Sequence, residues 1–348
     1  MNQFGIVEGF FGPEWSHQAR LDFAPFLRKH GGSFYIYAPK RDAHLRKKWR
    51  ELWASDFLEE LSDLRNHFHQ HQVQFGVALS PFELGHEIKE SDWGLLKQKF
   101  SILQSLQLDM LGLFFDDMPV TDDLLATQEK VIKLALNYFP NGLIFCPSFY
   151  SFDPILDKVF GQRPVGYVEG LKDIAPSTVD ICWTGPKVIS DEISREHLEE
   201  VSVLLGRKPF IWENLYANDG PKNCQFLKLK YFLGRDRSLS ESSSHVAFNL
   251  MNQPYLSQIL FLSSMKVIAG DSPKQAFEKS CYELLPTELA LLIIKFREKF
   301  LHEGLSKLSD DEKSQLKGEL EAVSHPVSTE IINWLNGYYI VGSECLTD

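Results

Sequence analysis

Two adjacent acidic residues, Asp116 and Asp117, directly follow an apolar run in the stretch GLFFDDMPV. Like charges a few ångströms apart repel, so one carboxyl group of such a pair has a raised pKa and keeps its proton near neutral pH. A protonated acid beside a carboxylate is suited to general acid–base chemistry. The alternative is structural, because Asp is common in turns and at helix N-caps. The interpretation of the pair therefore depends on the elements that position it.

Short apolar, β-branched or aromatic runs recur along the chain and predict strands. They span residues 4–9, 33–39, 73–80, 110–115, 142–147, 179–184, 208–214 and 245–250. Segments with helical spacing separate most of them, for example 55–71, 91–106 and 194–206, and Ser194 is an N-cap candidate for the last. Eight strands alternating with helices over about 265 residues predict an α/β fold of the (β/α)8 TIM barrel type. A doubly wound open sheet is the alternative, but it usually carries a glycine-rich phosphate loop, and the sequence has none.

In a barrel of this type the active site lies at the carboxyl ends of the strands. The residues at those ends are Gly9, Lys40, Asp116 with Asp117, Tyr150, Trp183 with Thr184, Trp212 with Asn214, and Asn249. Carboxylates and amides bind hydroxyl groups, and flat aromatic faces pack on the apolar face of a sugar ring. The set therefore indicates a carbohydrate pocket, although Trp183 and Trp212 have a second interpretation in which they only fill the barrel.

After residue 268 the pattern changes to consecutive helices, expected at 272–285, 286–304, 309–323 and 327–339. We therefore expect a catalytic barrel over residues 1–268 and a smaller helical C-terminal region over 269–348. The more direct role for that region is structural, with oligomerisation second. The polar, Ser-rich stretch 234–245 is predicted to be a mobile loop before the eighth strand.

Composition limits the classes of function. A formal net charge of −11 and the lack of a basic stripe argue against a nucleic-acid partner. No run of eighteen apolar residues predicts a membrane span, and the first residues lack the features of a signal peptide, so we expect a cytoplasmic protein. The five cysteines are scattered and form no Cys-x-x-Cys pair, which argues against a disulfide framework or a zinc knuckle.

Several strand ends together resemble a known enzyme family. The stretches are GIVEGFFG…W, YIYAPKRD…RKKWRELW, LFFDDM, FCPSFY, CWTGPKVIS and IWENLYANDG, in the family's order from residue 5 to about residue 257. They closely resemble glycoside hydrolase family 84, which contains the O-GlcNAcases and bacterial β-N-acetylglucosaminidases. The resemblance implies a cofactor-free (β/α)8 barrel that removes terminal β-linked N-acetylglucosamine (GlcNAc) with retention. It also implies substrate-assisted catalysis, in which the substrate's acetamide is the nucleophile and an oxazoline is the intermediate.

The resemblance also implies roles for individual residues. The family's first acid, which holds and polarises the acetamide, falls on Asp116, and its general acid/base falls on Asp117. Tyr150 matches the tyrosine that lines the acetamide and anomeric region, and Trp212 matches an aromatic wall. Val188 matches a residue beside the pocket. The matched sugar-binding positions are Gly9, Lys40, Asn214, Asp219 and Asn249.

The family's chemistry explains why two acids would be adjacent. Ordinary retaining glycosidases use two carboxylates about 5 Å apart across the scissile bond. When the acetamide is the nucleophile, the enzyme needs one acid at the leaving group and a second beside the acetamide nitrogen. Neighbouring residues at a strand end can supply both, because the chain turns there and the side chains need not alternate. We expect Asp117 to be the protonated acid and Asp116 to stay ionised.

The sequence departs from the family's usual pattern at three places. Arg41 and Asp42 stand where two acids are frequent, Glu213 stands where Asp is usual, and the first motif reads Gly-Pro-Glu-Trp. None of these changes removes a matched catalytic group. They leave the preference beyond the first sugar open, and the natural aglycone, whether protein, glycan or oligosaccharide, is not indicated. The substrate is expected to be a glycan or glycoprotein that bears β-GlcNAc, and the oligomeric state is not indicated.

Three other functions are compatible with parts of the sequence. A conventional retaining glycosidase would use Glu213 as nucleophile and Asp117 as acid. A non-catalytic barrel would bind GlcNAc without turnover, although the complete set of acids argues against this. A metal hydrolase would use His67 and His71, one helical turn apart, but no third ligand is suggested by spacing, so we expect no metal.

Overall fold

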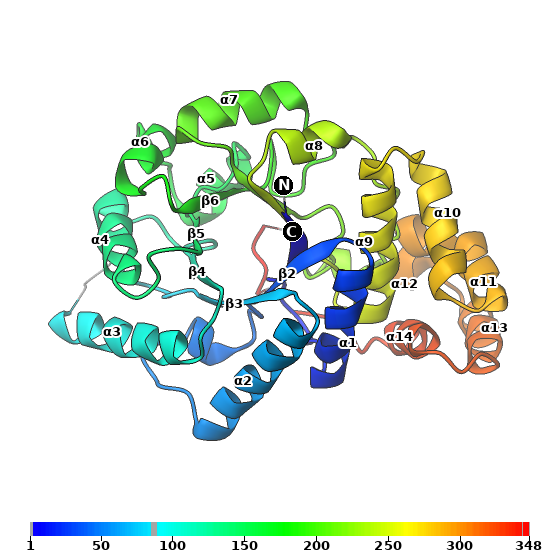
Figure 1. Ribbon diagram of the computed structural model, residues 1–348. Coiled ribbons are helices and arrows are strands. Elements are labelled where there is room, and N and C mark those ends of the chain that lie inside the picture. Colours follow the sequence, from blue (N-terminus) through cyan, green and yellow to red (C-terminus); the bar gives the residue numbers. More distant parts are fainter. Residues whose placement is uncertain (1–2, 85–88, 343, 348) are drawn as a thin grey trace.

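The computed structural model describes residues 3–84, 89–342 and 344–347. In these residues eight parallel strands pair in sequence order and close into a barrel (Figure 1). The strands are β1 (Gln3–Glu8), β2 (Gly32–Tyr37), β3 (Gln74–Leu79), β4 (Met110–Phe114), β5 (Leu143–Cys146), β6 (Asp180–Trp183), β7 (Phe210–Glu213) and β8 (His245–Phe248). The barrel closes where Phe4 of β1 pairs with Val246 of β8. The predicted (β/α)8 TIM barrel is confirmed, with a strand at each predicted position.

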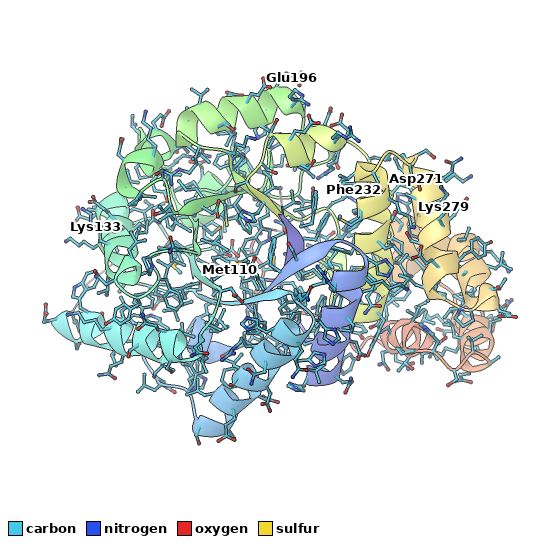
Figure 2. All side chains as sticks on the ribbon, in the orientation of Figure 1. Met110, Lys133, Glu196, Phe232, Asp271 and Lys279 are labelled. Carbon is cyan, nitrogen blue, oxygen red and sulfur yellow. The ribbon has the colours of Figure 1, made fainter. Side chains whose placement is uncertain are left out.

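A ring of helices surrounds the strands (Figure 1). They are α1 (His17–Lys29), α2 (Ser55–Gln70), α3 (Glu90–Ser105), α4 (Leu124–Leu136), α5 (Pro154–Phe160), α6 (Tyr167–Ile174), α7 (Arg195–Leu205), α8 (Arg237–Glu241) and α9 (Pro254–Ile268). Ser194 caps α7 as predicted, because its side chain accepts a hydrogen bond from the His197 backbone N–H at 3.2 Å. Figure 2 shows charged side chains such as Lys133 of α4 and Glu196 of α7 pointing away from the barrel. None of the helices in the described part of the chain has the length and apolar character needed to cross a bilayer.

The strands are apolar on both faces because both faces are buried. One face packs on the helices, and the other fills the barrel. Phe34 of β2 lies 5.9 Å from Phe210 of β7, measured between ring centroids, and His245 of β8 lies 5.5 Å from Phe210. Because β2 and β7 are not neighbours in the sheet, these rings meet inside the barrel. This aromatic layer closes the amino-terminal end and leaves only the carboxyl end available for a pocket.

The Ser-rich stretch 234–245 differs from the prediction, because it contains the short helix α8. The Asp236 side chain caps this helix by accepting a hydrogen bond from the Ser238 N–H at 2.7 Å. Leu239 anchors it and is fully buried. The prediction of a loop is therefore wrong for residues 237–241, which are helical. The N-cap and the single buried leucine that hold this helix are not evident from a Ser-rich composition.

The helices predicted after residue 268 are present and gather on one side of the barrel, beyond α9 (Figure 1). They are α10 (Pro273–Leu284), α11 (Thr287–Glu298), a π-helical turn (Lys299–Glu303), α12 (Gly304–Lys307), α13 (Asp310–Glu321) and α14 (Pro326–Leu335). They pack on α9 and on the long connection after β7. In that connection the Leu227 N–H donates to the Phe300 carbonyl at 3.1 Å, and the Trp334 indole N–H donates to the Cys224 carbonyl at 3.3 Å.

A buried carboxyl group joins α14 to the barrel. Glu330 accepts hydrogen bonds from the backbone N–H groups of Tyr255, at 2.8 Å, and Leu256, at 2.9 Å. These groups lie in the first turn of α9, where backbone donors have no partner within the helix. Burial raises the pKa of Glu330 to about 8, so the group is largely protonated at neutral pH. Glu330 lies on a helix some seventy residues later in the chain. It thus provides hydrogen-bond acceptors for the backbone N–H groups at the start of α9.

Replacing Glu330 should therefore lower stability. We expect Glu330→Ala to reduce the free energy of unfolding by about 1–3 kcal/mol, because it leaves buried backbone donors unsatisfied. Glu330→Gln keeps one acceptor oxygen and should lose less. Urea unfolding at pH 4 measures both, because Glu330 is then mostly protonated in the folded and the unfolded state and the comparison reports its hydrogen bonds. The exposed Glu321→Ala on α13 is the control. Equal effects of Glu330→Ala and Glu321→Ala would contradict the role given to Glu330.

Candidate active site

The carboxyl ends of the strands enclose a pocket with about 560 Å³ of empty space, open solvent included. All ten residues that the sequence assigned to the site line it: Gly9, Lys40, Asp116, Asp117, Tyr150, Val188, Trp212, Asn214, Asp219 and Asn249. They come from the ends of seven elements that are far apart in the sequence. Polar and aromatic groups that converge in this way are typical of a ligand-binding site.

The acid pair occupies the turn that follows β4. Asp116 is 5% exposed, and its Oδ2 forms an ion pair with the Lys40 ammonium group from the loop after β2. Its other oxygen, Oδ1, is buried and finds no hydrogen-bond partner within the described residues. A buried acceptor without a partner is costly, so this oxygen is a strong candidate to receive a ligand N–H or O–H group.

Asp117 faces the same pocket because the backbone reverses at this residue, where φ is +56°. The Tyr150 hydroxyl donates a hydrogen bond to its Oδ1 at 2.9 Å. Burial, and then the neighbouring Asp116 carboxylate, raise the pKa of Asp117, although Lys40, Arg46 and the Tyr150 hydrogen bond oppose the shift. Burial also keeps the pKa of Tyr150 well above its usual range, so its hydroxyl stays a donor. This environment favours a protonated Asp117.

A chain of amide groups crosses the pocket from β1 to the loop after β6. The Asn249 side chain accepts a hydrogen bond from the Gly9 N–H at 3.2 Å and donates one to the side-chain oxygen Oδ1 of Asn214 at 2.9 Å. Asn214 in turn donates to the Val188 backbone carbonyl at 3.0 Å. Each amide is therefore held in one orientation by its neighbour. The result is a rigid polar wall for ligand hydroxyl groups.

Trp212 forms an aromatic wall that depends on a glycine. A Cβ atom at Gly9 would lie 2.3 Å from the Trp212 ring, a distance that no side chain can tolerate. The indole also packs edge-to-face on Phe114 of β4, with ring centroids 4.9 Å apart. The absence of a side chain at Gly9 therefore leaves room for the Trp212 ring.

Asp219 lies on the long connection after β7 and is held by the loop after β1. Its Oδ2 accepts a hydrogen bond from the Phe11 N–H at 2.8 Å. Burial raises the pKa of Asp219 to about 6, so a carboxylate oxygen is available at neutral pH.

The pocket also contains residues that the sequence did not indicate, namely Phe11, Cys146, Ile189, Ala217, Asn223, Cys345 and Thr347. Phe11 and Ala217 lie within recognised motifs and could have been found by extending each motif along its loop. Cys345 and Thr347 are different, because they come from the segment after the helical region, shown in red in Figure 1, which returns to the barrel. No local pattern in the sequence links that segment to the pocket.

Trp183, one of the two candidate pocket tryptophans, lies elsewhere. Its indole N–H donates to His197 Nε2 of α7 at 3.1 Å, and its ring packs on Phe152 with centroids 4.9 Å apart. It therefore fills the layer between β6 and α7, and its expected place in the pocket is wrong. Thr184, the next residue, lines the pocket.

Glu213 faces away from Trp212 because side chains alternate along β7. Its oxygens accept two hydrogen bonds from the Arg235 guanidinium group, both at 2.8 Å, and one from the Leu215 N–H at 2.9 Å. Glu213 is 1% exposed. Both carboxylate oxygens are thus engaged in a buried ion pair, which leaves no oxygen for nucleophilic attack at a sugar.

The two histidines considered as metal ligands lie at the end of α2, with ring centroids 4.8 Å apart. His67 Nε2 lies 3.1 Å from the Leu21 carbonyl of α1. In the residues for which the structure gives positions, no group of three or more His, Cys, Asp and Glu side chains is arranged to hold a metal ion.

Comparison with known proteins identifies the family of this chain. A family model described as beta-N-acetylglucosaminidase matches residues 4–290. The Protein O-GlcNAcase of Rattus norvegicus and that of Mus musculus are each 31% identical over 237 residues, covering 64% of this chain. The match covers 25% of each relative, so the chain corresponds to about a quarter of their length.

A solved structure is also similar. A mutant of the Thermobaculum terrenum O-GlcNAc hydrolase is 26% identical and aligns with a TM-score of 0.78, covering 96% of this chain and 80% of that chain. The barrel fold and the match over residues 4–290 agree. This chain belongs to the β-N-acetylglucosaminidase family of glycoside hydrolases, glycoside hydrolase family 84.

Proposed function

We propose that this protein is a retaining β-N-acetylglucosaminidase of the O-GlcNAcase type. It removes terminal β-linked GlcNAc from a glycan or glycoprotein by substrate-assisted catalysis. The observation that carries the proposal is the contrast within the acid pair. Asp116 is ion-paired with Lys40 and keeps one buried oxygen without a partner among the residues described, whereas Asp117 lies where its protonated form is favoured.

In the first step the acetamide oxygen of the substrate attacks the anomeric carbon. Asp116 Oδ1 accepts a hydrogen bond from the acetamide N–H, which orients the amide and offsets the positive charge that develops on it. The bond from the anomeric carbon to the leaving oxygen breaks, and Asp117 transfers its proton to that oxygen. The product is a protonated oxazoline (oxazolinium ion) whose N–H stays hydrogen-bonded to Asp116, formed without an enzymic nucleophile.

In the second step water attacks the anomeric carbon from the side that the leaving group vacated. Asp117, now ionised, accepts a proton from this water. The bond between the anomeric carbon and the acetamide oxygen breaks, which regenerates the acetamide with overall retention. The Tyr150 hydroxyl, 2.9 Å from Asp117 Oδ1, stabilises the ionised acid between the two steps.

The remaining pocket residues have binding roles in this proposal. Trp212 packs on the apolar face of the sugar ring, and the Asn214 and Asn249 amides bind ring hydroxyl groups. Asp219 supplies a carboxylate acceptor for a hydroxyl group. Gly9 and Val188 shape the wall, and Lys40 holds Asp116.

Loss of the acid should depend on the leaving group. We expect Asp117→Asn to lose about 10²–10⁴-fold in kcat/KM on a phenyl β-N-acetylglucosaminide, because the departing oxygen needs a proton. The loss should be much smaller on the dinitrophenyl analogue, whose leaving group is stable without one. The exposed Asp122→Asn, in the same loop, is the control. Equal losses on both substrates would remove Asp117 from the acid role.

The pH dependence gives a second test. The alkaline limb of kcat/KM follows ionisation of the acid, so it moves with the pKa of Asp117. Asp116→Asn removes a like charge and should move this limb to lower pH. Tyr150→Phe removes a hydrogen bond to the ionised form and should move it to higher pH. Shifts in the same direction would contradict the assignment of Asp117.

A binding test does not require turnover. Four of the five cysteines are buried, whereas Cys345 is half-exposed and lines the pocket. Burial raises the pKa of the Cys345 thiol, so its modification by N-ethylmaleimide, followed by mass spectrometry, should be slow. GlcNAc bound in the pocket should slow it further, and Cys345→Ser should abolish the labelling. Protection without hydrolysis of an aryl β-GlcNAc would favour a sugar-binding barrel. Labelling that saturating GlcNAc does not slow would place the sugar elsewhere.

A conventional retaining mechanism makes a different prediction. An enzyme with Glu213 as nucleophile would not need the acetamide and would hydrolyse the aryl β-glucoside at a comparable rate. The buried ion pair of Glu213 with Arg235 argues against it. We therefore expect turnover of the acetamido sugar only.

A further inference from the structure

Arg46 contacts the backbone of the acid pair. It follows a 3₁₀ turn (Ala43–Leu45) in the loop after β2, and it is 4% exposed. Its Nη1 donates to the Asp116 backbone carbonyl at 3.3 Å and to Ser80 Oγ at 3.1 Å. Its Nη2 donates to the Asp117 backbone carbonyl at 3.0 Å. One guanidinium group thus holds two consecutive carbonyl groups and the end of β3.

The backbone at this turn is strained. Asp117 has φ of +56°, in the left-handed region that residues with a Cβ atom rarely adopt. Such a conformation costs about 1–2 kcal/mol and persists only where surrounding contacts hold it. Without this turn, consecutive side chains after a strand would point to opposite faces. The two hydrogen bonds from Arg46 are therefore contacts that keep both carboxyl groups directed into one pocket.

Arg46 also brings charge to the site. The groups that act electrostatically on Asp117 are Asp116, Lys40 and Arg46, with a hydrogen bond from Tyr150. Lys40 and Arg46 are the cations, and Lys40 is already paired with Asp116. Arg46 lies on the backbone side and lowers the pKa of Asp117, which partly offsets the effect of burial. Asp219 and Cys345 also lie within electrostatic range of Asp117.

We propose that Arg46 is a positioning residue for the reaction, which fixes the left-handed turn at Asp117 and thereby the directions of both acids. Its planar fork donates to two carbonyl oxygens in a fixed geometry, whereas the ammonium group of a lysine is a compact point charge on a flexible stem. The role of Arg46 in catalysis rests on the proposed function. Its role in holding the turn does not.

Arg50 provides a matched control in the same loop. Its guanidinium group also makes two hydrogen bonds, to the Asp92 carboxylate at 2.8 and 3.1 Å, and it also lies over an aromatic ring, that of Trp49. Arg46 likewise lies over the Phe82 ring, at 4.7 Å. The two arginines differ in whether they hold the acid pair and in burial, because the Arg50 side chain is 41% exposed.

The test compares Arg46→Met and Arg46→Lys with Arg50→Met in the full chain, with folding checked by circular dichroism. Arg46→Met should lower kcat on a phenyl β-N-acetylglucosaminide by about 100-fold, as expected for misplaced reacting groups, with a much smaller change in KM. It should also move the alkaline limb to higher pH, because a cation is lost. Arg46→Lys should keep the limb near that of wild type while kcat stays low. Arg50→Met should change neither.

Two results would overturn the proposal. One is an Arg46→Met enzyme whose kcat stays within about threefold of wild type. The other is a loss of kcat with no shift of the alkaline limb and no difference from Arg50→Met. A crystal structure of Arg46→Met gives a readout without activity, because residue 117 should leave the left-handed region. If wild type shows no turnover, the proposed function fails, and the φ angle at residue 117 still decides whether Arg46 holds the turn.

Discussion

The ion pair between Lys40 and Asp116 joins the ends of β2 and β4 within the pocket. The two side chains are only 4% and 8% exposed, so each charge depends on the other for stabilisation. Asp116 is paired with Lys40, and Asp117 is a second acid directly beside it. Burial and the neighbouring Asp116 carboxylate raise the pKa of Asp117. Two neighbours of identical chemistry thereby lie in different electrostatic environments, which is a common way for one site to supply both an acid and a base.

The remaining walls of the pocket depend on how closely the strands approach one another. Gly9 lacks the side chain that would collide with Trp212, and the alternation along β7 turns Trp212 inward and Glu213 outward. The Asn249–Asn214–Val188 chain of hydrogen bonds fixes the amides between β1, β8 and the loop after β6. A pocket built on strand ends in this way needs little rearrangement to bind a rigid ligand.

The helical region contributes to the same site. Glu330 of α14 satisfies the first turn of α9, and the Trp334 indole binds the connection that carries Asp219. Beyond α14, Cys345 and Thr347 line the pocket beside residues of the barrel. The helices after residue 268 are thus packed on the barrel, and the chain that follows them helps to line its mouth.

The sequence alone predicted the strands, their alternation with helices and the residues at the strand ends, because these depend on local periodicity and on motifs of contiguous residues. It did not distinguish Trp183 from Trp212. A tryptophan near a strand end faces the pocket or the helix layer according to its place in the pleat, and a shift of one residue reverses that choice. It also predicted a loop where Leu239 anchors α8.

Only the tertiary structure decided which groups act on the acids. Four features of the site depend on how distant segments come together. They are the left-handed turn at Asp117, the two hydrogen bonds from Arg46, the Asp116 oxygen that has no partner among the residues described, and the return of Cys345 to the pocket. Burial and charge at a carboxyl group depend on everything packed around it. The sequence therefore determined which residues could do the chemistry, and the closed barrel determined which of them face one another and in which protonation state.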